Sequence, residues 1–144
     1  MIAVAIAKHI DANVSGITRS NTAGGNLFLG RMPDKPDEAV AVMPQPGLPQ
    51  LDRSPTDLPT VQVLVRGAKR TPMSGYERAR AIYDALNCLD GVLLDEGGDD
   101  EVFVIGCTAV QSDPIPLGPD ATERPEWSLN FQLITHQPTT HRPA

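Results

Sequence analysis

Residues 59–86 constrain the fold more strongly than any other segment, because they predict a strand, a basic turn and a helix in direct succession. Val61, Val63 and Val65 alternate with Gln62 and Leu64, which is the period of a strand with one face on a core. The segment contains no catalytic signature. It therefore predicts packed structure without predicting chemistry.

The helix expected after this turn has signals at its start and along its sides. Ser74 and Glu77 have the spacing of a capping box, in which each side chain satisfies a backbone N–H at the helix start. Arg80 and Asp84 are four positions apart on the exposed side, where an ion pair is favoured. The face expected to meet the core carries Tyr76, Ala79, Ile82, Tyr83 and Leu86.

Periodicity predicts five further elements. Residues 2–14 repeat apolar side chains at the spacing of an amphipathic helix. Strands are expected at residues 26–31, 39–43, 102–110 and 127–135, with the first two joined as a hairpin. One antiparallel or mixed sheet of about four to five strands, with both helices packed on one face, would bury all these apolar stripes. The predicted fold class is therefore α+β.

The segments between these elements are rich in proline and charge. Five prolines fall within residues 44–59, which predicts an extended arm or loop and not a packed element. Residues 95–101 are an acidic loop, and residues 111–126 are a long loop broken by proline. Residues 136–144 predict a disordered tail. We expect a single α+β domain over residues 1–135.

Charge and cysteine content disfavour several classes of function. The net charge of −6 disfavours a protein dedicated to duplex DNA. Cys88 and Cys107 form no CxxC motif, so a reducing compartment such as a cytoplasm fits better than a disulfide framework. No apolar run approaches the roughly 20 residues of a membrane span, and the N-terminus lacks the basic start of an export signal. We expect no membrane partner.

No group of side chains predicts an enzyme, a metal centre or a cofactor site. The acidic loop lacks the ligand spacing of an EF-hand, so a solvated connection is the simpler interpretation. His9, His136 and His141 have no neighbour at triad-like or metal-like spacing. Cys88 and Cys107 are expected to be small core residues. We predict no catalytic residue, no metal and no cofactor.

Residues 66–80 hold the one concentration of positive charge. A solvated face is the default interpretation, and a charge-complementary contact with another protein is the sharper one. DNA binding ranks third, because one small patch neutralises few phosphates. Leu64 lies on the outward face of its strand. Exposed strands and long loops suggest a chain that completes its packing against other chains.

Three segments, at residues 26–43, 59–86 and 109–135, cover most of the chain, and they contain four short patterns. The patterns comprise the end of a strand, a Tyr-x-x-Ala-x-x-Ile helix, a loop, and part of the last strand. The residues are Arg66-Gly67, Tyr76 with Ala79 and Ile82, Pro116-Leu117-Gly118, and Asn130-Phe131.

In order and spacing, these segments resemble the bacteriophage minor capsid or tail terminator proteins of long-tailed phages. No single pattern is diagnostic, but their common order makes chance a poor explanation. The chain departs from the family at one place: a basic residue often follows Pro-Leu-Gly, whereas Pro119 stands here. A partner contact through that basic residue is therefore not carried over.

The resemblance implies a small α+β subunit that assembles as a homohexameric ring, without catalysis or cofactor. Such a ring sits on the last ring of the tail tube, stops its polymerisation and offers a surface to the head-side connector or stopper protein. It implies a virion protein of the head–tail junction, assembled in the cytoplasm of the host bacterium. Phage DNA would pass through the lumen, and we expect some of the surplus acids to line it, because carboxylates repel phosphates.

A ring needs two different contact surfaces on each subunit. The basic turn and helix and the acidic loop are candidates for such a pair. The residues expected at subunit or partner contacts are Leu64, Arg66, Lys69, Arg70, Arg78, Arg80, Asp95, Glu96, Asp99, Asp100 and Glu101.

Two alternatives stay open at this stage. A different neck or head-completion component of similar size would also lack activity and would differ in its partner. A monomeric metal-binding α+β domain using the loop at residues 95–101 belongs to another class. That domain would be stabilised by the metal and would not assemble.

Overall fold

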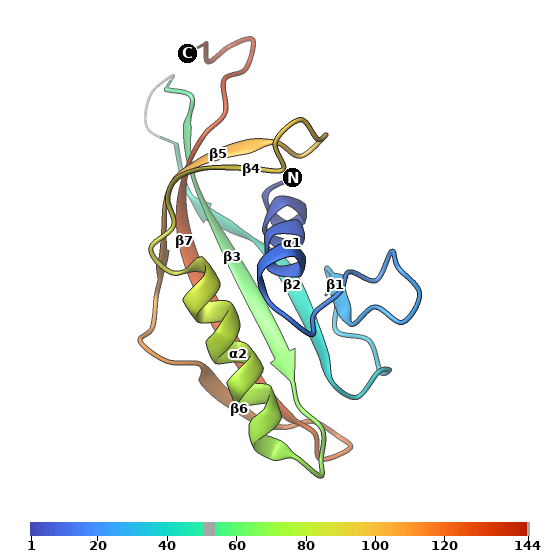
Figure 1. Cartoon of the computed structure of the whole chain (residues 1–144). Helices are drawn as coiled ribbons and strands as arrows, with labels where there is room; N and C mark the ends of the chain where they lie inside the picture. Colours follow the sequence, from blue (N-terminus) through green and yellow to red (C-terminus); the bar gives the residue numbers. More distant parts are fainter. Residues whose placement is uncertain (51–53, 144) are drawn as a thin grey trace.

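The computed structural model describes residues 1–50 and 54–143 (Figure 1). Within these residues the chain forms two helices and seven strands, and strand residues outnumber helical residues about two to one. In chain order the elements are α1 (Ile2–Asn13), β1 (Leu27–Leu29), β2 (Ala39–Leu48), β3 (Thr56–Arg66), α2 (Pro72–Leu86), β4 (Asp90–Leu94), β5 (Val102–Ala109), β6 (Ile115–Pro119) and β7 (Pro125–His136).

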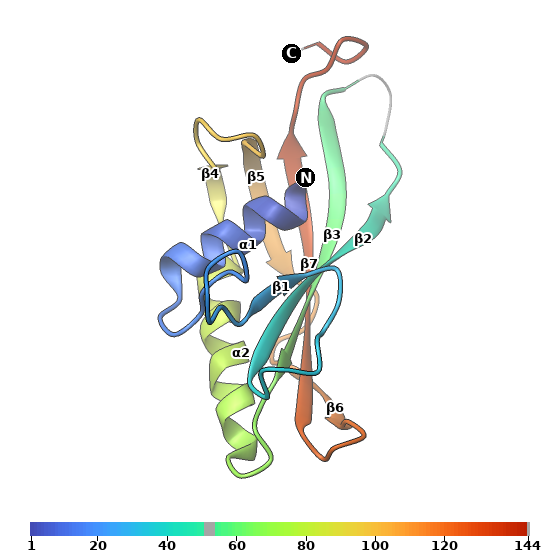
Figure 2. The same cartoon turned by 90° about the vertical axis from the view of Figure 1, so that its right-hand side faces the viewer.

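The described strands belong to one mixed sheet with the order β1-β2-β3-β7-β5-β4. β6 pairs with β7 alongside its first half, where β5 does not reach. β1 and β2 are parallel, and the other pairs are antiparallel. The sheet is strongly curled, and both helices lie on one side of it (Figure 2).

The predicted fold class was wrong, because the chain is mostly β and its sheet has seven strands in the described part instead of four or five. One missing strand, β6, and the extension of β2 beyond residue 43 lie in proline-rich segments that we expected to be loops, whereas the other missing strand, β4, directly follows α2. β2 runs through Pro44 and Pro46, and β6 contains Pro116 and Pro119. Beyond Met43, β2 pairs with β3 alone, and β6 pairs with β7 alone. Proline is tolerated on such edges because its missing N–H has no partner to lose.

Two local predictions also need correction. β1 and β2 do not form a hairpin, because their pairing is parallel, with Leu27 opposite Val40. The capping box is absent: α2 has Thr71 at its N-cap and Pro72 in its first turn, and the Ser74 hydroxyl donates to Glu38. Proline suits this first turn since its N–H would be unpaired there in any case.

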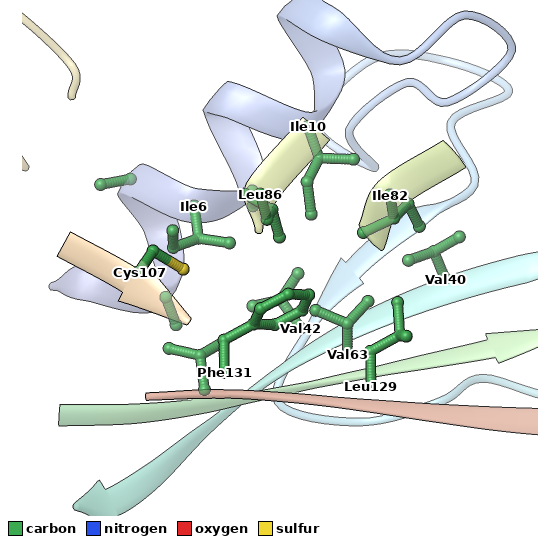
Figure 3. Close-up of a cluster of buried hydrophobic side chains, with 14 of the residues drawn as sticks. Ile6, Ile10, Val40, Val42, Val63, Ile82, Leu86, Cys107, Leu129 and Phe131 are labelled. Carbon is green, nitrogen blue, oxygen red and sulfur yellow. The ribbon is translucent and has the colours of Figure 1, made fainter. Parts of the chain in front are cut away.

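The core lies between the helices and the curled sheet. Ile6 of α1 and Ile82 of α2 point towards Phe131 and Val63 of the central strands (Figure 3). Each of these side chains is at most 1% exposed. The alternation of the valines in β3 is thus explained, because Val63 and its neighbours two residues away face the helices.

α2 approaches the sheet closely at its first turn. A Cβ atom on Gly75 would lie 2.9 Å from the backbone nitrogen of Gly67 and 3.0 Å from the indole of Trp127. The Tyr76 ring packs edge-on against the same indole, with ring centroids 5.3 Å apart. A side chain at position 75 would therefore push the helix away from β3 and β7.

The segment after β7 contacts the start of β3. The backbone N–H of Gln137 donates to the carbonyl of Pro55, and the Arg142 guanidinium pairs with both carboxylate oxygens of Asp57 at 2.6 and 2.9 Å. These contacts do not test whether residues 136–144 are disordered in solution, so that remains a prediction. No helix in the described part of the chain is both long and apolar enough to cross a membrane.

Candidate assembly surfaces

The residues expected at contacts do not form one surface. The basic residues lie at the end of β3 and along α2, whereas the acidic loop joins β4 to β5 near the N-terminus (Figure 1). Several of them are held by other side chains of the same subunit. What matters for assembly is therefore which of these groups have no partner within the described chain.

Arg66 is buried, with 3% of its surface exposed. Its guanidinium donates to four backbone carbonyl groups in the loop between β1 and β2, at distances of 2.6 to 3.2 Å. These carbonyls belong to residues 33, 34, 36 and 37. Arg66 therefore fixes a loop of its own subunit. Leu64, two residues earlier on the same face, is half-buried.

Arg124 also holds this loop, and no sequence pattern indicated its role. Its guanidinium donates to Asp120 at 2.8 Å, to the Asp34 carbonyl at 2.6 Å and to Asp37 at 3.1 Å. Burial disfavours the ionised form of Asp120, but hydrogen bonds from the backbone of Arg124 and Thr122 and from the Arg124 side chain outweigh it and lower its pKa to about 2. We call this pair of arginines and the loops they hold the arginine clamp.

Arg80 is also engaged within the subunit. Its guanidinium lies 3.2 Å from Asp113 and 3.5 Å from Asp84, and its Cζ atom is 4.5 Å from the centre of the Tyr83 ring. Tyr76 donates to the same Asp113 at 2.9 Å. The Arg80–Asp84 pair predicted from the sequence is therefore present, and the basic side of α2 holds the connection between β5 and β6.

The remaining basic residues differ in whether they form an ion pair within the described chain. Lys69 pairs with Glu123. Arg70 and Arg78 make no ion pair among the described residues, and neither do Arg31 and Lys35 in the loop after β1. The sequence interpretation overlooked these last two, since they are separated from the basic cluster along the chain.

The acidic loop is tied to α1 by two of its five acids. The Lys8 ammonium lies 2.8 Å from Asp95 and 3.6 Å from Asp100, and the N-terminal amine lies 2.8 Å from Asp100. The hydrogen bond from Lys8 lowers the pKa of Asp95, and that from the N-terminal amine lowers the pKa of Asp100. These two carboxylates therefore serve to dock the first helix.

The other three acids of this loop, Glu96, Asp99 and Glu101, are exposed and have no basic partner in the described chain. Glu101 accepts a hydrogen bond from the backbone of Gly97 at 2.7 Å. Residues 1–50 and 54–143 contain no group of three or more potential ligands placed to hold a metal ion. The loop is thus an acidic protrusion with part of its charge unpaired.

A groove runs beside this loop, between α1 and the outer edge of β4. β4 pairs with β5 alone among the described strands, so its other edge is unpaired. The groove is lined by Lys8, His9, Ala12 and Asn13 of α1 and by Val92, Leu93, Leu94 and Asp95 at β4.

Large apolar side chains are exposed around the same edge, on the sheet face away from the helices. Leu93 is 40% exposed and lies opposite Phe103, which is 38% exposed. Ile105 and Ile134 continue this patch across β5 to β7 and are 38% and 39% exposed. A soluble subunit seldom leaves such side chains together without a partner.

The cysteines and histidines form no reactive site in the described chain. Cys107 is buried, and burial raises the pKa of its thiol to about 12, which keeps it protonated. Cys88 is exposed at the end of α2, so its predicted place in the core was wrong. His9 contacts Asn13 at 3.3 Å, on the rim of the groove.

Comparison with known protein families supports a structural interpretation of these surfaces. The family described as bacteriophage tail terminator protein matches residues 9–137, which include all four patterns noted in the sequence. A search of the curated proteins finds no match. The chain therefore belongs to the bacteriophage tail terminator family, whose members are structural proteins of phage tails.

Proposed function

We propose that this protein forms a closed homohexameric ring on the last ring of the tail tube, stops tube polymerisation and presents a surface to the head-side connector. The match to the tail terminator family over residues 9–137 is the observation that carries the proposal. The protein would act at the head–tail junction without catalysis, after assembly in the host cytoplasm. Phage DNA would pass through its lumen.

The structure supports this role through its two different sheet ends. A closed ring of identical subunits needs two unlike contact surfaces on each subunit. In the described sheet, β1 lies at one end and β4 at the other; among the described residues, basic side chains without an ion pair follow β1 (Arg31 and Lys35), and acidic side chains without one follow β4 (Glu96 and Asp99). A curled sheet with unlike ends suits head-to-tail contacts arranged around an axis.

The neck or head-completion alternative differs in the partner that is bound. It predicts binding to a head-side protein without any effect on the tail tube. The metal-binding alternative has less support, because Asp95 and Asp100 already pair with Lys8 and the N-terminal amine.

Tail tube protein of the same phage, polymerised with increasing amounts of this chain, tests the proposal. We expect shorter tubes capped at one end, visible by negative-stain electron microscopy, and a length that falls as the chain is added. Tubes of unchanged length without caps would contradict the proposal. Binding to a portal-side protein in that case would favour the neck alternative.

A further inference from the structure

We propose that the groove between α1 and β4 receives the β1 end of a second copy of this chain, so that the two ends of the sheet meet in the ring. The inference deepens the proposed function and rests on it. It specifies which surfaces join, whereas family membership specifies only the kind of protein.

The receiving surface is the groove between α1 and β4. The groove is lined largely by apolar groups, including Ala12 of α1 and Val92 and Leu93 of β4. The β4 edge along it has no strand partner among the described residues. An unpaired strand edge that continues into exposed apolar side chains is a surface that other chains readily cover.

The inserted surface is the exposed part of the β1 end. β1 lies at the opposite end of the sheet, and its outer edge is partly covered: Leu27 bridges Arg19, with the Ser20 N–H donating to the Leu27 carbonyl at 2.8 Å. Leu29 lies beyond that bridge and is 41% exposed. The exposed part of the β1 end is therefore a short apolar tip followed by Arg31.

Charge selects a second copy of the chain as the occupant of the groove. Arg31 and Lys35 follow β1 and have no ion-pair partner in the described chain. Glu96 and Asp99 follow β4 and are equally unpaired. Placing the β1 tip of one subunit in the β4 groove of the next brings these opposite charges to one contact, where they would set register and direction.

Cysteine cross-linking tests the contact directly. Leu29→Cys and Leu93→Cys are combined with Cys88→Ser, so that the two introduced thiols are the exposed ones; Cys107 is buried. Mild oxidation of the assembled protein, alone and on tail tubes, should give a ladder of disulfide-linked oligomers in non-reducing gels. In the matched control, Leu29→Cys is combined with Leu117→Cys on β6, whose native side chain is 52% exposed. We expect no ladder from it.

A charge exchange gives a second readout. Arg31→Glu should lower the assembled fraction about tenfold, and the added Glu96→Arg change should restore most of it. A Leu29→Cys/Leu93→Cys variant that assembles like the wild type but yields no ladder would overturn the inference. Cross-linking of Leu93→Cys to the tube protein instead of to a second copy would also overturn it. Either result would leave tube termination intact, whereas unchanged tube length would count against the proposed function itself.

Discussion

The two faces of the sheet are made by the same strands, but they differ in what covers them. On the face towards the helices, Val63, Leu129 and Phe131 are at most 1% exposed. On the opposite face, Gln62 and Asn130 alternate with them and are half-buried, and Phe103 is exposed. Within the described residues, α1 and α2 cover one face, and loops cover part of the other.

This difference separates residues that hold the subunit together from residues available to other subunits. The covered face gains its stability from close packing, which is sensitive to volume. The open face is mostly polar along its centre and apolar near the β4 edge. Substitutions that distinguish the faces should therefore affect stability on one side and assembly on the other.

Phenylalanine provides the sharpest comparison. Phe131→Ala should lower the free energy of unfolding by about 3–5 kcal/mol, because it leaves a cavity between the helices and the sheet. Phe103→Ala, on the open face, should cost less than about 1.5 kcal/mol, because its ring is already partly in water. Urea unfolding followed by circular dichroism measures both. Equal losses would remove the distinction between the faces.

The arginine clamp provides a second comparison, because it lies on the open face but is covered by loops. Arg66→Met should lower the free energy of unfolding by about 2–4 kcal/mol, since the carbonyls of the loop would lose their buried donor. Arg70→Met, at an exposed arginine, should change it by less than about 0.5 kcal/mol. Thermal unfolding of both variants checks this. A loss from Arg66→Met no greater than that from Arg70→Met would show that the clamp is unimportant.

The pH dependence of stability should show a smaller effect of the same clamp. The folded pKa of Asp120, about 2, lies below its ordinary value of 3.8. Such a group contributes stability that is complete above the unfolded pKa and is lost as the pH falls through the folded pKa. We therefore expect the free energy of unfolding to fall between about pH 4 and pH 2. The fall should be shallower in Asp120→Asn.

Asp57, Asp95 and Asp100, whose pKa values are also lowered, should preserve part of this slope in the variant. Urea titrations at several pH values measure the slope. Superimposable curves for the variant and the wild type would show that Asp120 is not linked to folding.

The sequence predicted the elements whose pattern is strong and missed those whose pattern is interrupted. β3, α2 and β7 were expected within a few residues of their ends, because alternation or helical spacing is continuous in each. β6 was missed because its prolines indicate a loop, and β4 because five residues directly after a helix carry little periodicity. The sequence did not indicate that β1 pairs in parallel with β2, because the side-chain pattern of a three-residue strand is the same in either direction.

The candidate site was less predictable than the fold. Charge runs identified the acidic loop, but no local pattern shows that Lys8 and the N-terminal amine neutralise part of it. Arg66 looked like a surface residue because strand alternation places it outward, and only the tertiary structure brings the loop carbonyls over it. Arg124 contacts Asp34 from a position 90 residues away, a separation at which sequence spacing carries no information.

Native mass spectrometry of the purified chain, alone and bound to short tail tubes, tests the central claim most directly. A ring-forming tail terminator should appear as a species of six 15.4 kDa subunits in at least one of the two samples. Leu93→Ser should shift that species towards monomer. It should leave the unfolding midpoint nearly unchanged, because Leu93 lies on the edge strand β4 and its side chain is 40% exposed. A wild-type protein that stays monomeric in both samples would contradict the account.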